Sequence, residues 1–327
     1  MNMKILLMTF ILMMSTLITL TSNNWLGMWM GMEINLMSFI PLMSNKSDKK
    51  ASQSMMIYFL TQSIGSIIML FSILSSKFIL YNMNTQMMEM ILTIGLLIKL
   101  GGAPFHMWLP EMASNLNWKN LMILMTWQKI APMTILSNNN NNSIYMFIIL
   151  STLVGAIGGL NQTSLRKIMA YSSINHLSWM MMLMMMENNW LMYLTLYSLI
   201  IMMMFTMLNK KNILFVNQLN MNKMTTMEKM TFTSLMMSMG GLPPFTGFLP
   251  KWLTIQSMMN SNLWLMMLLM VMMSLITLFY YLRMMYPLIM IYNTKMKWLN
   301  LMINSKTMIT ILLFNIMLPI MLMLPLF

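Results

Sequence analysis

The chain has no cysteine and only two histidines among its 327 residues. Zinc, haem and iron–sulfur centres take their ligands from thiolates and clustered imidazoles, so these centres are not expected. The sequence also has no Walker lysine motif, no G-x-G-x-x-G segment after a strand and no Ser-His-Asp set. We therefore expect no metal, cofactor or nucleotide in this chain, and no covalent catalysis.

Charge is scarce as well. Charged residues make up 8% of the chain and hydrophobic residues 58%, whereas soluble domains carry roughly a quarter charged residues. The apolar residues come in runs of about 20, the length of a membrane-spanning helix. The longest stretch without a clear span, 209–228, is too short for a core of its own. The sequence predicts an all-α polytopic membrane protein with a single transmembrane domain over residues 1–327.

Methionine is abundant, with 58 copies. Methionine replaces leucine or isoleucine in packed helices, so we interpret the excess as the codon bias of a mitochondrial genome; a copper-binding role is the alternative. No Arg-rich presequence precedes the first span. We expect the protein to be made in the compartment whose membrane it enters.

Eleven spans are predicted, and the ninth is long enough that it must be bent or broken. The spans are 4–20, 25–43, 55–75, 87–109, 119–137, 144–160, 170–186, 190–208, 229–258, 262–291 and 307–326.

Loop charges predict the orientation of these spans. Most loop lysines and arginines follow even-numbered spans, on the side of the N-terminal Lys4, whereas the loops after odd-numbered spans hold Lys77, Glu89 and Glu187. Positive loops mark the inner side of a membrane. We expect the N-terminus on the inner side of the membrane and the C-terminus on the outer side; a docking surface is the alternative interpretation of the basic loops.

When the charges near span ends are counted with the loops, four charged residues remain inside predicted spans: Glu33, Lys99, Lys129 and Lys251. Each charge at membrane depth costs on the order of 2.5–3.5 kcal/mol on insertion scales, so such residues are rare and usually functional. Glu33 lies about 12 Å deep if its helix starts near Trp25, because each helical residue rises about 1.5 Å. The alternative for each charge is a static ion pair or a side chain that reaches the surface.

Two of these charges lie beside helix breaks. The segments "KLGGAPFHMWLP" (99–110) and "SMGGLPPFTGFLPKW" (238–252) both place Gly-Gly before Pro-Phe and Leu-Pro. Glycine and proline weaken a helix, and non-helical backbone at membrane depth must be covered by protein or water. The segments lie five spans apart and so cross the membrane in opposite directions. Interrupted helices at corresponding inverted positions are typical of inverted-repeat transporters.

Protons are the cargo that suits these residues. Burial favours the neutral form of a lysine, and a nearby carboxylate favours the charged form. At an effective dielectric constant near 20, opposite charges about 4 Å apart attract by about 4 kcal/mol. Moving one charge through 100 mV takes about 2.3 kcal/mol. A Glu33–Lys99 pair that closes and opens is therefore strong enough to hold and release a proton.

Histidine titrates near neutrality, so His106 and His176 are candidate proton relays, although a packing or capping role is equally open. Ser172, Ser173 and Asn175 lie near His176 and are candidates for holding water.

Several segments together resemble one family. They are "SNNWLGMWMGMEINLMSFIPL", "KLGGAPFHMWLPEM", "LMTWQKIAP", "GAIGGLNQTSLRKIMAYSSINHLSWM" and "GGLPPFTGFLPKW". In this order they resemble the chain 2 family of NADH–ubiquinone oxidoreductase, the membrane subunits of respiratory complex I. That family is similar to Mrp-type cation/proton antiporters, whose fold holds two inverted five-helix repeats, each with a broken helix. This chain starts three helices later than bacterial members, which fits eleven spans.

The resemblance implies roles for individual residues. Glu33 and Lys99 match the family's carboxylate–lysine pair, Lys129 matches the central lysine, and Lys251 matches the lysine at the second break. His106 and His176 lie in family motifs whose roles are less settled. The resemblance also implies proton translocation in the mitochondrial inner membrane, with other membrane-arm subunits and lipids such as cardiolipin as partners. NAD, FMN, iron–sulfur clusters and ubiquinone are then expected in other subunits.

Two rival functions remain at this point. A free-standing sodium or potassium/proton antiporter is disfavoured because only one intramembrane carboxylate is available to coordinate a metal cation. A purely structural membrane-arm subunit would leave four buried charges without a purpose.

Overall fold

The structure is a computed structural model that describes residues 3–44, 49–78, 85–139, 142–187, 189–221, 225–290 and 305–317. These residues are mainly helical and belong to two compact units, Met1–Ser151 and Thr152–Phe327. Some sequence predictions fall outside the described residues: the loop charges Lys46, Asp48, Lys223, Lys295 and Lys297, and the end of the eleventh span.

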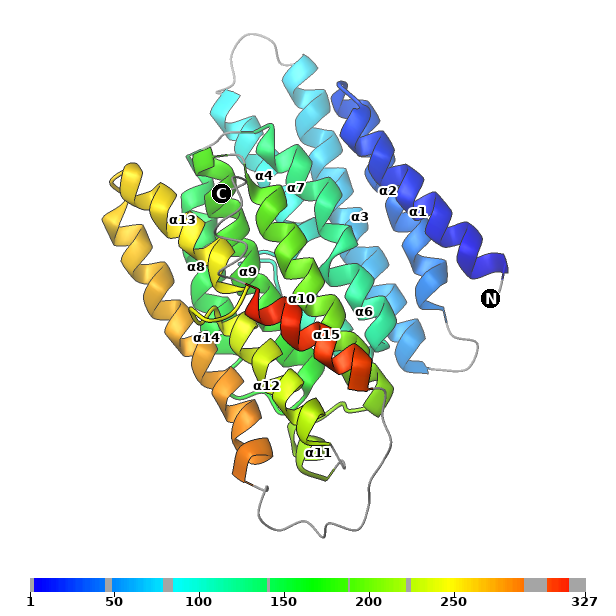
Figure 1. The fold of residues 1–327 in the computed structure, drawn as a ribbon. Coiled ribbons are helices and arrows are strands. Elements are labelled where there is room, and N and C mark those ends of the chain that lie inside the picture. The colour runs from blue at the N-terminus through cyan, green and yellow to red at the C-terminus, as the bar shows by residue number, and fades with distance from the viewer. Residues whose placement is uncertain are drawn as a thin grey trace. The chain divides into compact units, whose positions relative to one another are not determined.

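The N-terminal unit is built from seven α-helices, a 3₁₀ turn and the start of α8. They are α1 (Met3–Thr21), α2 (Trp25–Met43), α3 (Lys49–Phe78), α4 (Thr85–Leu100), α5 (Trp108–Asn115), α6 (Trp118–Met125), η1 (Trp127–Lys129), α7 (Ile130–Ser137) and α8 (Ile144–Gly158). Helix α1 packs against α2, and α3 packs against both α4 and α5 (Figure 1).

Small residues allow these helices to approach closely. A Cβ at Gly31 of α2 would lie 2.4 Å from the Thr19 side chain of α1, and a Cβ at Gly95 of α4 would lie 3.0 Å from the Gly65 carbonyl of α3. Glycine at such crossings is common in membrane helix pairs. The close α3–α4 contact places the side chain of Lys99 directly over Gly65, since an added Cβ there would meet Lys99 Cγ at 3.0 Å.

The described residues of the C-terminal unit form helices α9 to α15. They are α9 (Leu165–Glu187), α10 (Trp190–Lys211), α11 (Val216–Met221), α12 (Thr226–Gly240), α13 (Phe248–Asn260), α14 (Trp264–Met290) and α15 (Ser305–Ile316). Helix α12 packs against α10, α14 and α15, and α13 packs against α9 (Figure 1).

A capping box fixes the start of α12. The Thr225 hydroxyl accepts a hydrogen bond from the Glu228 N–H, and the Glu228 carboxylate accepts one from the Thr225 N–H. Glu228 also lies 2.9 Å from Lys211 Nζ, at the end of α10. Glu228, which the sequence suggested was a loop charge, is therefore a buried anchor between two helices.

Among the described residues, five helices are long and apolar enough to cross a membrane: α1, α2, α3, α10 and α14. Many large apolar side chains on α1 and α14 are exposed, as expected of helices that face lipid. The structure confirms an all-helical chain with several apolar spans, and the count of eleven stays a prediction.

The structure also changes one predicted span. The fifth, 119–137, is not continuous, because the 3₁₀ turn η1 separates α6 from α7. Pro132 has no N–H with which to reach the carbonyl of Gln128, so the α-helical bond is missing at this turn. Lys129 ends the turn.

Candidate functional site

The first helix break follows Leu100, where α4 ends. Gly101 adopts the left-handed conformation with φ 72°, which glycine reaches without strain. The N–H of Gly102 donates to the carbonyl of Leu97 at 3.0 Å, as in a Schellman motif. The chain turns helical again at Trp108, so the break predicted between Lys99 and Pro110 is present.

Neutral side chains satisfy the carbonyls that this break frees. Gln62 Nε2 donates to the Lys99 carbonyl at 3.1 Å, and Trp108 Nε1 donates to the Ile98 carbonyl at 3.1 Å. Buried carbonyls without a donor are costly, so these bonds keep the interrupted backbone stable. Gln62 comes from α3 and Trp108 from the start of α5.

The second break repeats the backbone of the first. Gly241 has φ 77°, and the N–H of Leu242 donates to the carbonyl of Met237 at 3.3 Å. Both resumed helices begin alike, since Leu109 N–H bonds to His106 O at 3.0 Å and Leu249 N–H bonds to Thr246 O at 3.3 Å. The two motifs found in the sequence therefore form similar helix ends and helix starts, although the Ala103–Pro104 peptide bond of the first is cis.

The lysines lie on opposite sides of the two breaks. Lys99 belongs to the last turn of α4, before its break, whereas Lys251 belongs to the first turn of α13, after its break. Lys251 Nζ donates to the Gly240 carbonyl at 2.8 Å and lies 5.9 Å from the centre of the Trp179 ring. A cation at a helix C-terminus is stabilised by the helix dipole, and the aromatic face adds a cation–π contact.

The structure brings Glu33 and Lys99 together. Their charged atoms, Oε1 and Nζ, are 3.9 Å apart, and their side chains are 26% and 3% exposed. This distance permits an ion pair but is too long for a direct hydrogen bond. Glu33 Oε1 accepts no hydrogen bond within the described part of the chain.

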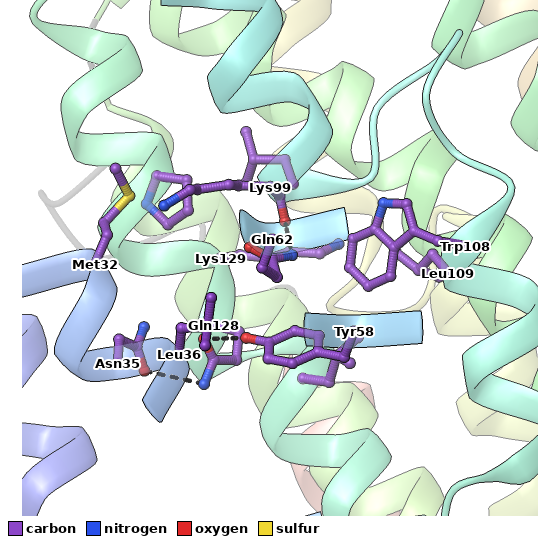
Figure 2. Close-up of a pocket in the computed structure, with 13 residues that line it drawn as sticks. Met32, Asn35, Leu36, Tyr58, Gln62, Lys99, Trp108, Leu109, Gln128 and Lys129 are labelled. Atoms are coloured by element: carbon purple, nitrogen blue, oxygen red, sulfur yellow. Dashed lines mark hydrogen bonds between the residues drawn. The ribbon is translucent and has the colours of Figure 1, made fainter. Parts of the chain in front are cut away.

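Lys99 and Lys129 line one cavity in the N-terminal unit (Figure 2). Its empty volume is about 470 Å³ with the mouth included. Both lysines are buried: counted over the whole residue, Lys99 is 7% exposed and Lys129 is 3% exposed. Polar side chains share the lining with them, so the cavity can hold ordered water, which needs polar partners as well as space.

Sequence reasoning missed this polar lining, which consists of Asn35, Tyr58, Gln62 and Gln128. Gln128 Nε2 donates to Asn35 Oδ1 at 3.0 Å, and the Tyr58 hydroxyl donates to Gln128 Oε1 at 3.4 Å (Figure 2). These bonds connect α2, α3 and η1 across the cavity. The signal available in the sequence was a polar amide within an apolar run, as at Gln62 in "FLTQSIGS".

The two histidines have different surroundings. His106 lies in the loop of the first break, where its Nδ1 is 3.1 Å from the Pro104 carbonyl, and it does not line the cavity of Lys99 and Lys129. His176 is buried in α9, and its Nδ1 is 2.8 Å from the Tyr193 hydroxyl of α10. The structure thus brings His176 to a buried polar partner on another helix.

The serines near His176 bond within their own helix. Ser172 donates to the Met169 carbonyl at 2.8 Å and Ser173 to the Ala170 carbonyl at 2.7 Å. Their predicted role in holding water stays a prediction. Within the described residues, no group of three or more His, Cys, Asp or Glu side chains is placed to hold a metal ion.

Known sequences resemble this chain closely. A family profile described as "NADH:quinone oxidoreductase/Mrp antiporter, TM" matches residues 22–277. The NADH-ubiquinone oxidoreductase chain 2 of Anopheles gambiae is 45% identical over 93% of this chain and 92% of its own length. The protein of the same name from Locusta migratoria is 38% identical over 92% and 90%.

Solved structures share the fold at lower identity. A chain of respiratory complex I from Thermus thermophilus superimposes with a TM-score of 0.79 at 21% identity, covering 88% of this chain and 70% of that one. A chain of the Mrp complex from Dietzia gives 0.77 at 15% identity, covering 85% and 59%. With broken helices, buried lysines and sequence likeness in agreement, the chain belongs to the NADH:quinone oxidoreductase/Mrp antiporter family.

Proposed function

We propose that the chain is a proton-translocating membrane subunit of a mitochondrial NADH:ubiquinone oxidoreductase, respiratory complex I. The names of the Anopheles and Locusta relatives support this assignment, because the identity extends over nine-tenths of both chains. NADH oxidation, flavin and iron–sulfur electron transfer and ubiquinone reduction belong to other subunits. This chain couples the energy that they release to proton movement.

The arrangement of Glu33, Lys99 and Lys129 is the observation that carries the proposal. Glu33 at 3.9 Å stabilises the protonated form of Lys99, and Lys129 faces Lys99 across a shared polar cavity. When Glu33 moves away, Lys99 is left buried without its counter-ion and releases the proton. Water held by the polar lining carries the proton to Lys129.

In the C-terminal unit, Lys251 takes the corresponding role. Its ammonium is buried, bonded to Gly240 O and placed over Trp179. Among the described residues, no carboxylate forms an ion pair with Lys251, so its ammonium can release and take up a proton as its surroundings change. His176 is a candidate relay in this unit, and His106 remains a weaker candidate at the first break.

The membrane arrangement is part of the same proposal. We infer a single antiporter-like domain of eleven spans, with two inverted repeats and one broken helix in each. The matching backbone of the two breaks supports repeats of one ancestral unit. Loop charges support an N-terminus in the matrix and a C-terminus in the intermembrane space of the inner membrane. Other membrane-arm subunits and lipids such as cardiolipin are the partners.

The two rivals make different predictions. A free-standing cation/proton antiporter needs oxygen ligands for its metal ion, and no carboxylate is among the residues that line the cavity of Lys99 and Lys129. A structural subunit would not need two buried lysines around a polar cavity, because buried charges destabilise a membrane protein.

A native gel tests the assignment to the complex. Inner membranes are solubilised in mild detergent, separated, stained for NADH dehydrogenase activity and probed for this chain by mass spectrometry. We expect the chain in the large active band. A chain that migrates alone or as a small oligomer without that activity would favour the antiporter, and ion-flux assays in liposomes would follow.

A further inference from the structure

His176 makes a buried hydrogen bond that links two helices of the C-terminal unit. Its Nδ1 is 2.8 Å from the Tyr193 hydroxyl, within the range of a good hydrogen bond. His176 and Tyr193 are 5% and 1% exposed. Both side chains are therefore shielded from solvent, and their hydrogen bond joins α9 to α10.

More tyrosines surround this pair. The Tyr197 ring centre lies 4.9 Å from that of His176, and the rings of Tyr280 and Tyr281 on α14 lie 4.7 Å apart. Tyr281 interacts electrostatically with Tyr193. The hydroxyls of Tyr280 and Tyr281 are buried and make no hydrogen bond among the described residues. A hydroxyl both donates and accepts a hydrogen bond, so these groups can take up a proton once a side chain or a water moves to connect them.

One side of α9 relates the cluster to the buried lysine. Trp179 follows His176 by three residues, and residues three apart share one face of a helix. The Lys251 ammonium lies over the Trp179 ring, 5.9 Å from the ring centre. His176 is thus one helical turn from the surroundings of Lys251, and it is also in contact with the Tyr193 hydroxyl.

We propose that Tyr193 is a proton-relay residue, the hydroxyl through which His176 passes protons within the C-terminal unit. This inference rests on the proposed function and adds a residue to it. His176 first takes up a proton on Nε2, and the imidazolium then releases its Nδ1 proton to the Tyr193 oxygen while Tyr193 gives its own phenolic proton to a neighbouring hydroxyl or water. The N–H bond broken at Nδ1 is matched by the O–H bond formed on Tyr193, and the O–H bond broken on Tyr193 is matched by the O–H bond formed on the acceptor. His176 returns to its neutral form, Tyr193 stays neutral, and the acceptor carries the proton onward.

The test is Tyr193→Phe in the assembled complex. Phenylalanine keeps the ring and its packing but removes the hydroxyl. The complex is reconstituted in liposomes, and protons moved are measured per assembled complex and per NADH oxidised. Positioned proton-transfer groups contribute about 10²–10⁴-fold to a rate and water replaces them in part, so we expect proton transport to fall about tenfold.

Tyr286→Phe is the matched control. Tyr286 lies on α14 and is 61% exposed, so loss of its hydroxyl should leave transport unchanged. Lys129→Met serves as the reference for the proposed function itself. If Lys129→Met loses transport while Tyr193→Phe keeps it, the relay is wrong and the function stands; if both keep it, the function fails as well.

An infrared measurement separates a relay from a merely structural hydrogen bond. Complexes with ring-labelled tyrosine are compared before and during NADH turnover. We expect a change in a tyrosine C–O band that Tyr193→Phe removes. A wild-type complex without any such change would overturn the proposal, and this result does not depend on whether the variant assembles.

Discussion

The two helix breaks end and restart their helices in the same way but are stabilised by different chemistry. At the first, the amide of Gln62 and the indole of Trp108 donate to the freed carbonyls of Lys99 and Ile98. At the second, the donor to the Gly240 carbonyl is the ammonium of Lys251. Neutral donors thus hold one break, whereas a proposed proton carrier holds the other.

Loss of a proton from the lysine should therefore have a different effect on the backbone at each break. When Lys99 becomes neutral, the caps from Gln62 and Trp108 are unaffected, so the first break keeps its geometry. When Lys251 becomes neutral, the charge-assisted bond to Gly240 O becomes an ordinary one, about half as strong. The second break is therefore the place where proton occupancy and backbone position are coupled.

Replacing Lys99 or Lys251 by methionine should reveal the largest difference between the two breaks. We expect Lys99→Met and Lys251→Met both to lose proton transport, but only Lys251→Met to loosen its break. The Gly240 carbonyl then lacks its side-chain donor, which costs about 1–3 kcal/mol. Hydrogen–deuterium exchange of the assembled complex should be about tenfold or more faster in 237–250 of Lys251→Met, since 1.4 kcal/mol is a factor of ten.

In Lys99→Met, exchange in 97–110 should stay near the wild-type rate. Equal acceleration at both breaks would contradict the distinction between neutral and charged caps.

Alanine at the left-handed glycines sharpens the comparison. Gly101→Ala and Gly241→Ala should each destabilise by about 1–2 kcal/mol, because a Cβ is strained at positive φ. The new methyl group meets Leu109 Cδ1 at 2.8 Å in the first case, but Lys251 Cδ at 2.7 Å and Nζ at 3.0 Å in the second. Gly241→Ala should therefore displace the ammonium and reduce transport more than Gly101→Ala.

Proton transport per assembled complex measures this difference, and thermal stability of the purified complexes checks that both variants are similarly destabilised. Equal transport in the two variants would mean that the position of Lys251 matters little.

The smallest effect is expected from Gln62→Leu. It removes the neutral cap of the Lys99 carbonyl, which should destabilise the first break by about 1–3 kcal/mol and speed exchange in 97–105. Transport should fall less than in Lys99→Met, because the lysine and its partner Glu33 remain. Ser63→Ala is the control on the same helix, where Ser63 bonds to Leu60 O. Unchanged exchange in Gln62→Leu would show that the amide is not a structural cap.

Residue type and spacing were enough to predict the main features of this site. Gly-Gly followed by Pro-Phe marked the breaks, and charges in apolar runs marked Glu33 and Lys99, which the structure places 3.9 Å apart. The polar lining of Asn35, Tyr58 and Gln128 was not predicted. It depends on how α2 and α3 rotate toward one cavity, and rotation follows from packing with distant residues.

The other differences have similar causes. The 3₁₀ turn at Lys129 follows from the missing donor of Pro132, but an apolar run that contains proline can also remain a kinked helix. The sequence placed a lysine beside each break, and only the folded chain distinguishes a lysine before the break from one that caps it. The burial of Glu228 needed Lys211 from a helix that ends earlier in the chain.

Proton transport by the Lys129→Met complex tests the central claim most directly. The variant is assembled, checked on a native gel and reconstituted in liposomes, where protons moved are counted per NADH oxidised and per complex. If buried lysines of this chain carry protons, transport falls several-fold in a complex that still assembles. An assembled Lys129→Met complex that moves protons at the wild-type rate and ratio would contradict the account and leave the chain a structural subunit.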